Sequence, residues 1–133
     1  MRNNALGFSL MELLLVLTLV SVILSLAIPT WRQHQLSAGR QQAWLQLQRI
    51  GLQQEMWHIQ HGEYFADIGL ASPAVEQVRY SYQVQLSEIG FLLSATVNVN
   101  GPQSYDVFCW RLTLSDTGEM KSLGKGGEIQ LCK

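Results

Sequence analysis

The spacing of apolar residues divides the chain into three stretches with different periods. Over residues 8–28 nearly every position is apolar, and the exceptions are Glu12 and a few hydroxyl residues. Over residues 31–61 apolar residues recur at helical spacing between glutamines and arginines, which predicts an amphipathic helix. From Val78 onward the period changes to two, which indicates β-strands.

The first stretch is long enough to cross a membrane once. At a rise of about 1.5 Å per residue, a helix over residues 8–28 would span the roughly 30 Å hydrocarbon core of a bilayer. Pro29 follows, and we expect a kink or a local loss of helix there, because proline removes a backbone donor and clashes with the preceding turn. Residues 1–7 carry Arg2 and no acid, so the positive-inside bias places them on the cytoplasmic side.

The period-two stretch predicts an antiparallel sheet of about four strands. We expect strands at residues 78–86, 91–99, 105–114 and 119–122, because turn signals separate these runs. Gly62 fits a helix C-cap, and residues 63–77 read as an irregular connection. A sheet with one apolar face needs a cover. The helix residues expected to provide that cover are Trp44, Leu47, Ile50, Trp57 and Ile59.

The charges of the chain are nearly balanced. Nine Lys and Arg face ten Asp and Glu, for a formal net charge of −1. Nucleic acid is not expected as a partner, because phosphate binding needs a clustered positive face. We expect Arg32, Arg40 and Arg49 to form a solvated or intersubunit face.

Two cysteines, Cys109 and Cys132, lie in the last quarter of the chain. If this part is exported they can pair, because oxidising compartments preserve disulfides. Closing a loop of this size is typically worth about 3 kcal/mol in the chain-entropy account. The alternative is two unrelated buried thiols.

Catalytic and metal-binding patterns are missing from the sequence. There is no nucleophile elbow, Gly-rich phosphate loop or paired-carboxylate arrangement, so we expect no enzyme activity and no cofactor. Glu55 and His58 have the acid-x-x-His spacing of di-iron bundles, with His61 one turn on. A metal would need a second such unit, so we interpret these residues as ordinary helix surface and expect no metal. Core packing is the better interpretation of Trp44 and Trp57.

Glu12 is the residue that a plain membrane anchor does not explain. An acid at membrane depth costs several kcal/mol unless it is paired or neutralised. A secretory signal peptide is also disfavoured. Residues 25–27 have the small-residue shape of a cleavage site, but Pro29 follows closely and the apolar run contains an acid.

The residues around Glu12 resemble the class III signal of the type IV pilin family. A short leader ends in Gly7, Phe8 follows, and an acid stands at the fifth residue after that junction. An unbroken apolar run comes next, with Pro29 near its end. The resemblance implies an α+β fold, in which a long N-terminal helix packs on an antiparallel sheet of about four strands. It also implies a C-terminal loop bonded by the disulfide between Cys109 and Cys132.

The resemblance further implies a domain organisation and a maturation pathway. Residues 1–7 would be a cleaved leader, 8–29 the transmembrane and filament-core half of the helix, and 30–133 the globular domain. A prepilin peptidase would cut between Gly7 and Phe8, and the new amino group of Phe8 would be N-methylated. Glu12 would then pair with the positively charged N-terminus of a neighbouring subunit, which would relieve the penalty on an isolated carboxylate.

The second half of the chain indicates which type of pilin it resembles. The segments QSYDVFC at 103–109 and LTLSDTGE at 112–119 resemble small minor pilins of the PilE type, and the short chain left after cleavage also favours a minor pilin. The function implied is a structural subunit of a type IV pilus. Its implied partners are other pilins, major and minor, the prepilin peptidase, the inner-membrane assembly machinery, and the membrane before assembly. The implied location is the bacterial inner membrane, with the globular domain periplasmic, and afterwards the filament at the cell surface.

Two alternatives stay open. A pseudopilin of a type II secretion system shares the same leader, and a major member of that group often carries calcium in its C-terminal loop. Asp116, Glu119 and Glu128 are too scattered for such a site. The other alternative is a plain membrane-anchored periplasmic binding module.

Overall fold

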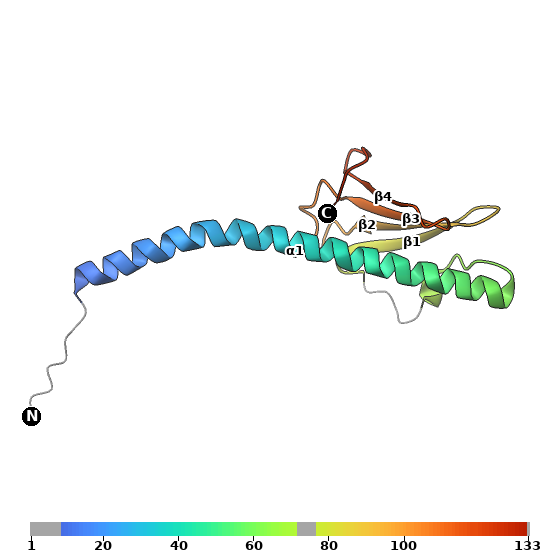
Figure 1. Cartoon of the computed structure of the whole chain (residues 1–133), viewed down its shortest axis with the longest axis horizontal. Helices are drawn as coiled ribbons and strands as arrows, with labels where there is room; N and C mark the ends of the chain where they lie inside the picture. Colours follow the sequence, from blue (N-terminus) through green and yellow to red (C-terminus); the bar gives the residue numbers. More distant parts are fainter. Residues whose placement is uncertain (1–8, 72–76, 133) are drawn as a thin grey trace, which may run out of the picture. The chain divides into compact units, whose positions relative to one another are not determined.

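A long helix followed by a four-stranded antiparallel sheet makes up the fold (Figure 1). The computed structural model describes residues 9–71 and 77–132. The chain forms two compact units, Met1–Gln35 and Leu36–Lys133. Helix α1 (Leu10–His61) runs through both units, and the sheet belongs to the second. The α+β fold predicted from the residue pattern is confirmed.

Helix α1 ends at the residue that the sequence predicts. Gly62 follows His61 with φ +78°, and its backbone N–H donates to the carbonyl of His58 at 2.8 Å. This left-handed conformation suits glycine, which has no Cβ to clash. The helix continues through Pro29, so the expected local loss of helix does not occur there. The kink at Pro29 stays a prediction.

The sheet has the order β1-β2-β3-β4, with each strand antiparallel to its neighbours. The strands are β1 (Tyr80–Leu86), β2 (Phe91–Val97), β3 (Arg111–Ser115) and β4 (Met120–Leu123), and a short 3-10 helix, η1 (Ile68–Leu70), precedes them. The expected third strand over 105–114 was too long at its start. Residues 101–106 instead fold through successive turns, in which Ser104 donates to Gly101 and Asp106 donates to Gln103. Polar groups that bond within these turns are not free for a strand ladder.

The core lies between one face of the sheet and the part of α1 in the second unit. Helix residues Gly39, Ala43, Leu47, Ile50, Gly51 and Gln54 are buried. The sheet contributes apolar side chains from alternate positions of its first three strands: Tyr80, Tyr82, Phe91, Leu93, Ala95, Val97, Leu112 and Leu114. Trp44 and Trp57 pack against this core from its margin and are partly buried, as expected. Ile59 was wrongly assigned to the core, because nine residues after Ile50 a helix has turned to its opposite side, and Ile59 is 83% exposed.

Glycines on the buried face of α1 let the helix lie close to the sheet and to the loop before β3. An added Cβ at Gly39 would overlap Oε1 of Gln103, a side chain that is fully buried. At Gly51 an added Cβ would lie 3.4 Å from Leu114 and 3.8 Å from Leu93, which are ordinary packing distances. Gly39 is therefore required by close packing, and Gly51 is not.

Gly39→Ala and Gly51→Ala are expected to change stability in opposite directions. The amide of Gln103 bonds Leu36 and Asp106, so it cannot move away from a new methyl group without breaking these bonds. We expect Gly39→Ala to lower the free energy of unfolding by about 1–3 kcal/mol. Gly51→Ala should raise it by up to about 1 kcal/mol, because alanine is the better helix former. Denaturant unfolding of the full chain in detergent, followed by tryptophan fluorescence, measures both; equal effects would contradict the packing at Gly39.

Candidate functional site

The surface of α1 in the first unit is apolar and uncovered. One window of 18 residues has a mean hydropathy of 2.6, and none of it is buried. The large apolar side chains of residues 10–28 are between 45% and 78% exposed. By length and composition, this helix can cross a membrane. The structure therefore offers a long apolar cylinder that no described residue of the chain covers.

The hydroxyl side chains on this cylinder are satisfied within the helix. Thr18 donates to the carbonyl of Leu15 at 2.8 Å, and Ser21 donates to that of Thr18 at 2.8 Å. Ser25 bonds in the same way, at 2.7 Å. Such local bonds let hydroxyl groups enter an apolar environment, where a polar group without a partner is costly.

Glu12 is different, because its carboxylate has no partner among the residues that the structure describes. Its backbone N–H donates to the carbonyl of Ser9 at 3.0 Å, so the residue lies in the first turn of α1. The positive end of the helix dipole favours an acid there. Gly7 and Phe8 lie outside the described residues, so cleavage between them and methylation of Phe8 stay predictions.

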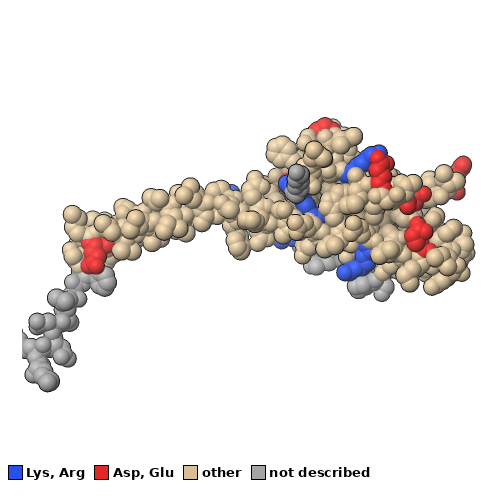
Figure 2. Space-filling model, in the orientation of Figure 1, with Lys and Arg blue, Asp and Glu red and all other residues tan. Residues whose placement is uncertain are grey.

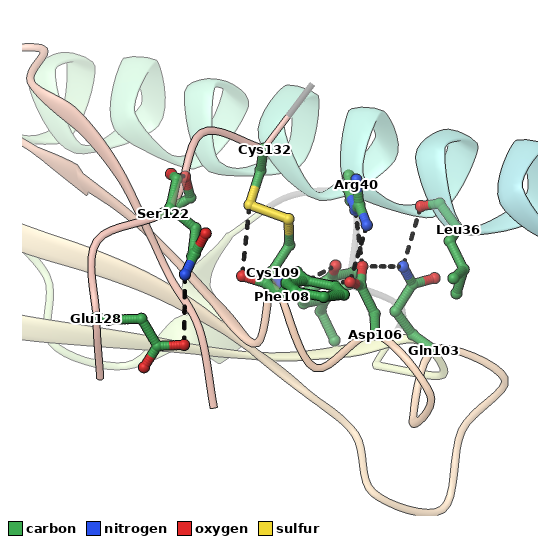
Figure 3. Close-up of a disulfide and its surroundings, with 11 residues drawn as sticks. Leu36, Arg40, Gln103, Asp106, Phe108, Cys109, Ser122, Glu128 and Cys132 are labelled. Atoms are coloured by element: carbon green, nitrogen blue, oxygen red, sulfur yellow. Dashed lines mark hydrogen bonds and ion pairs between the residues drawn. A yellow bond between two sulfur atoms is a disulfide. The ribbon is translucent and has the colours of Figure 1, made fainter. Parts of the chain in front are cut away.

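A buried ion pair joins α1 to the loop before β3 (Figure 3). The guanidinium of Arg40 donates from Nε to Oδ2 of Asp106 at 2.8 Å and from Nη2 to Oδ1 at 2.9 Å. The carboxylate is fully buried, and the guanidinium is mostly buried. The expectation that Arg40 belongs to a solvated or intersubunit face was wrong, because Asp106 draws its side chain into the domain.

The remaining lone pairs of Asp106 are also used. Gln103 donates from Nε2 to Oδ2 at 2.9 Å and to the backbone carbonyl of Leu36 at 3.0 Å. The backbone N–H of Cys109 donates to Oδ1 at 3.2 Å. Figure 3 shows Gln103 between Asp106 and Leu36, so the amide links the loop to α1 at a second point.

The surroundings of Arg40 favour its charged form. The hydrogen bonding that Arg40 donates to Asp106 has the largest influence on the pKa of Arg40 and raises it above the ordinary value, while burial opposes the rise. Arginine is already protonated throughout the physiological range. The guanidinium of Arg40 therefore stays charged and acts as a permanent structural clamp on the loop.

The predicted disulfide is present and lies beside this clamp. Cys109 and Cys132 are bonded, with their Cα atoms 5.9 Å apart. Cys109 lies in the turn before β3, since that strand begins only at Arg111. The tail that carries Cys132 is also held to β4, because the backbone N–H of Gln130 donates to the carbonyl of Ser122 at 2.9 Å. The bond therefore closes the C-terminal tail onto the loop that Asp106 organises.

The other sequence-predicted candidates take separate places. His58 stacks on Tyr64 with ring centroids 4.3 Å apart, and His61 stacks on Trp57 at 3.9 Å. Within residues 9–71 and 77–132 there is no group of three His, Cys, Asp or Glu that could hold a metal ion. Glu119 pairs with Lys121 at 3.1 Å.

Sequence reasoning missed the roles of Gln103 and Asp106. Both lie in the QSYDVFC segment, and an Asp three residues before Cys109 is a local signal for a carboxylate that accepts a backbone N–H. Nothing local indicates that Arg40 would be the partner, because it lies 66 residues away.

The chain matches no model of a known protein family and no curated protein. The physical contrast between its two units is what bears on function. The first unit exposes an apolar helix with one acid, and the second has a buried ion pair and a disulfide that hold its loop and tail.

Asp106→Ala is expected to be severely destabilising. It removes four acceptor contacts and leaves Arg40 largely buried without a counter-ion, which typically costs about 3–5 kcal/mol. Lys121→Ala is the matched control, because it breaks an exposed ion pair and should cost no more than about 0.5 kcal/mol. Chemical denaturation of both variants as full chains in detergent gives the comparison. Similar losses for the two would mean that the buried pair is not a clamp.

The folded chain is expected to lose stability above pH 10. Burial raises the pKa of Tyr82 to about 12, compared with about 10 for an unfolded tyrosine. Burial also raises the pKa of Tyr80. Since the folded pKa is the higher one, the neutral phenols contribute stability that is fully present below pH 10 and is lost as pH rises toward 12. Tyr82→Phe should flatten this decline, and Tyr105→Phe, at an exposed position, is the control. Urea midpoints at pH 9 and pH 11 test this, and an unchanged decline in Tyr82→Phe would refute it.

Proposed function

We propose that this protein is a minor pilin of a type IV pilus, a structural subunit that assembles through its N-terminal helix into a helical filament. The observation that carries the proposal is Glu12, an acid without a described partner on an apolar helix that is otherwise suited to lipid. A helix that only anchored the chain would gain nothing from this carboxylate.

The exposed helix requires a covering in two successive environments. Lipid covers the apolar side chains while the subunit is stored in the inner membrane. Neighbouring helices cover the same side chains in a filament. Glu12 makes the second state the more favourable one, because the methylated amino group of a neighbouring Phe8 can neutralise it in a region of low dielectric constant.

The second unit supports placement outside the cytoplasm. Its disulfide persists in oxidising compartments such as the periplasm and the cell surface, and is rare in the cytosol. In the loop between β2 and β3, which the disulfide joins to the C-terminal tail, Gln103 and Asp106 are bonded inside the domain. We assign this unit to the periplasmic face of the membrane, and afterwards to the outside of the filament.

Maturation and assembly require several partners of this chain. A prepilin peptidase removes residues 1–7 and exposes the amino group of Phe8 for methylation. The inner-membrane assembly machinery then extracts the helix, and major and minor pilins surround it. No enzymatic step and no cofactor is assigned to the chain itself.

Processing and assembly separate this proposal from a plain anchored binding module. In a bacterium with a type IV pilus machine, the wild-type protein should begin at a methylated Phe8, and Gly7→Ala should remain uncut, as shown by intact mass and N-terminal sequencing. Glu12→Gln should be cut normally but recovered in sheared filaments at about a tenth of the wild-type level or less, because the neutral amide cannot pair with an amino group.

Ser21→Ala is the control for the second measurement, because its hydroxyl bonds only within the helix. It should enter filaments like the wild type. A mature protein that keeps Met1, or full incorporation of Glu12→Gln, would support a plain anchor and refute the proposal.

A further inference from the structure

In the second unit, two arginines lie at one end of the sheet and two exposed acids lie at the other. Arg79 precedes β1 and Arg111 begins β3, and the strand register places both at one end. Glu88 lies in the β1–β2 turn and Asp116 in the β3–β4 turn, at the other end. Figure 2 shows several acidic side chains of this unit gathered at one end. A domain with opposite charges at its ends is suited to contacts between one end and the other.

A groove of about 440 Å³ opens between α1 and the start of β1. Arg49 and Arg79 contribute two guanidinium groups to it, and the described residues that line it include no carboxylate. Arg49 is exposed and makes no hydrogen bond or ion pair with any residue in the described ranges. Leu45 and Val78, both exposed, provide apolar surface beside these cations. The groove therefore suits an acidic group that has an apolar neighbour.

The turn between β1 and β2 carries such a pair. Its two ends are joined by a hydrogen bond from the backbone N–H of Ser87 to the carbonyl of Gly90 at 2.9 Å. Glu88 is exposed and has no partner among the described residues, and Ile89 beside it is 90% exposed. Figure 1 shows the turn projecting from the sheet. We call residues 87–90 the hairpin tip.

We propose that the hairpin tip of one copy docks into the groove of a second copy, with Glu88 against Arg49 and Arg79. Ile89 would then cover the exposed side chains of Leu45 and Val78. The two surfaces have opposite charge, and each joins a charged group to an apolar one. A second copy supplies a carboxylate and an apolar side chain together, whereas a solvent ion supplies only a charge.

The contact joins unlike surfaces. The groove lies at the start of β1 and the hairpin tip follows its end, roughly 20 Å away for a strand of this length. Because each copy keeps a free groove or a free tip after one contact, the association can repeat along a row of copies. Its place in a filament rests on the proposed function, but the contact itself uses only residues of the second unit.

Photo-crosslinking of the full chain in membranes tests where the hairpin tip lies. A photoreactive amino acid at Ile89 should give a ladder of homo-oligomers, with crosslinked peptides from residues 42–49 or 78–82. The same amino acid at Ile129, an exposed position that is bridged to β4 on the sheet edge opposite β1, is the control. Crosslinks from Ile89 that stop at dimers, map elsewhere, join only other proteins or do not exceed the control would overturn the proposal.

Charge reversal tests the ion pair itself. Arg49→Glu and Glu88→Arg should each lower the crosslinking yield from Ile89 about tenfold, because like charges then face one another. The double variant should recover to within about threefold of wild type, since the opposite charges face each other again. Arg111→Glu, which reverses an exposed charge outside the groove, is the matched control. Unaffected single variants, or a double variant as weak as either single one, would refute the contact.

Leader processing, measured in the same strains, separates this inference from the proposed function. Cleavage at Phe8 without crosslinks to the groove would remove the docking contact and leave the pilin proposal standing. Crosslinks to the groove in a chain that keeps its leader would do the reverse. Circular dichroism melting of each variant checks that it is folded; both reversed side chains are exposed, so normal melting is expected.

Discussion

The ion pair between Arg40 and Asp106 is the interaction on which the second unit depends most. One carboxylate accepts bonds from the helix, from Gln103 and from the backbone of Cys109, and it is fully buried. It thereby holds the loop before β3 against α1 and fixes the position of Cys109, one of the two disulfide cysteines. Gly39 belongs to the same arrangement, because only a residue without a side chain leaves room for Gln103. The helix, the loop and the tail are joined at this single polar centre.

The two acids Glu12 and Asp106 show how one chain treats a carboxylate in opposite ways. Asp106 accepts two hydrogen bonds from its cation Arg40 and two more from Gln103 and the backbone of Cys109, so its charge is satisfied within the second unit. Glu12 lies on an apolar helix, and no described residue neutralises it. An acid satisfied within the fold requires nothing more, whereas an acid left in an apolar region favours association with a cation from elsewhere. This difference is the physical basis for proposing an assembly subunit.

The surface of the second unit also has features that suit association with another copy. Arg79 and Arg111 lie at one end of the sheet and Glu88 and Asp116 at the other, and a groove opens beside Arg79. Polar and apolar groups are paired in both the groove and the hairpin tip. Contacts of this kind add specificity and register to an association whose main driving force would be the burial of the apolar helix.

Local sequence determined the elements, and tertiary structure determined their polar connections. The period of apolar residues predicted the helix, the antiparallel sheet and the role of Leu47 and Ile50, because burial on one face repeats with the geometry of each element. Gly62 marked the helix end through its own backbone conformation. The partner of Arg40 was beyond such reasoning, since an ion pair across 66 residues depends on how the loop docks on the helix. The turns that delay β3 to Arg111 close through local backbone bonds, but the bonds from Gln103 to Leu36 and Asp106 that hold them against α1 exist only in the folded chain.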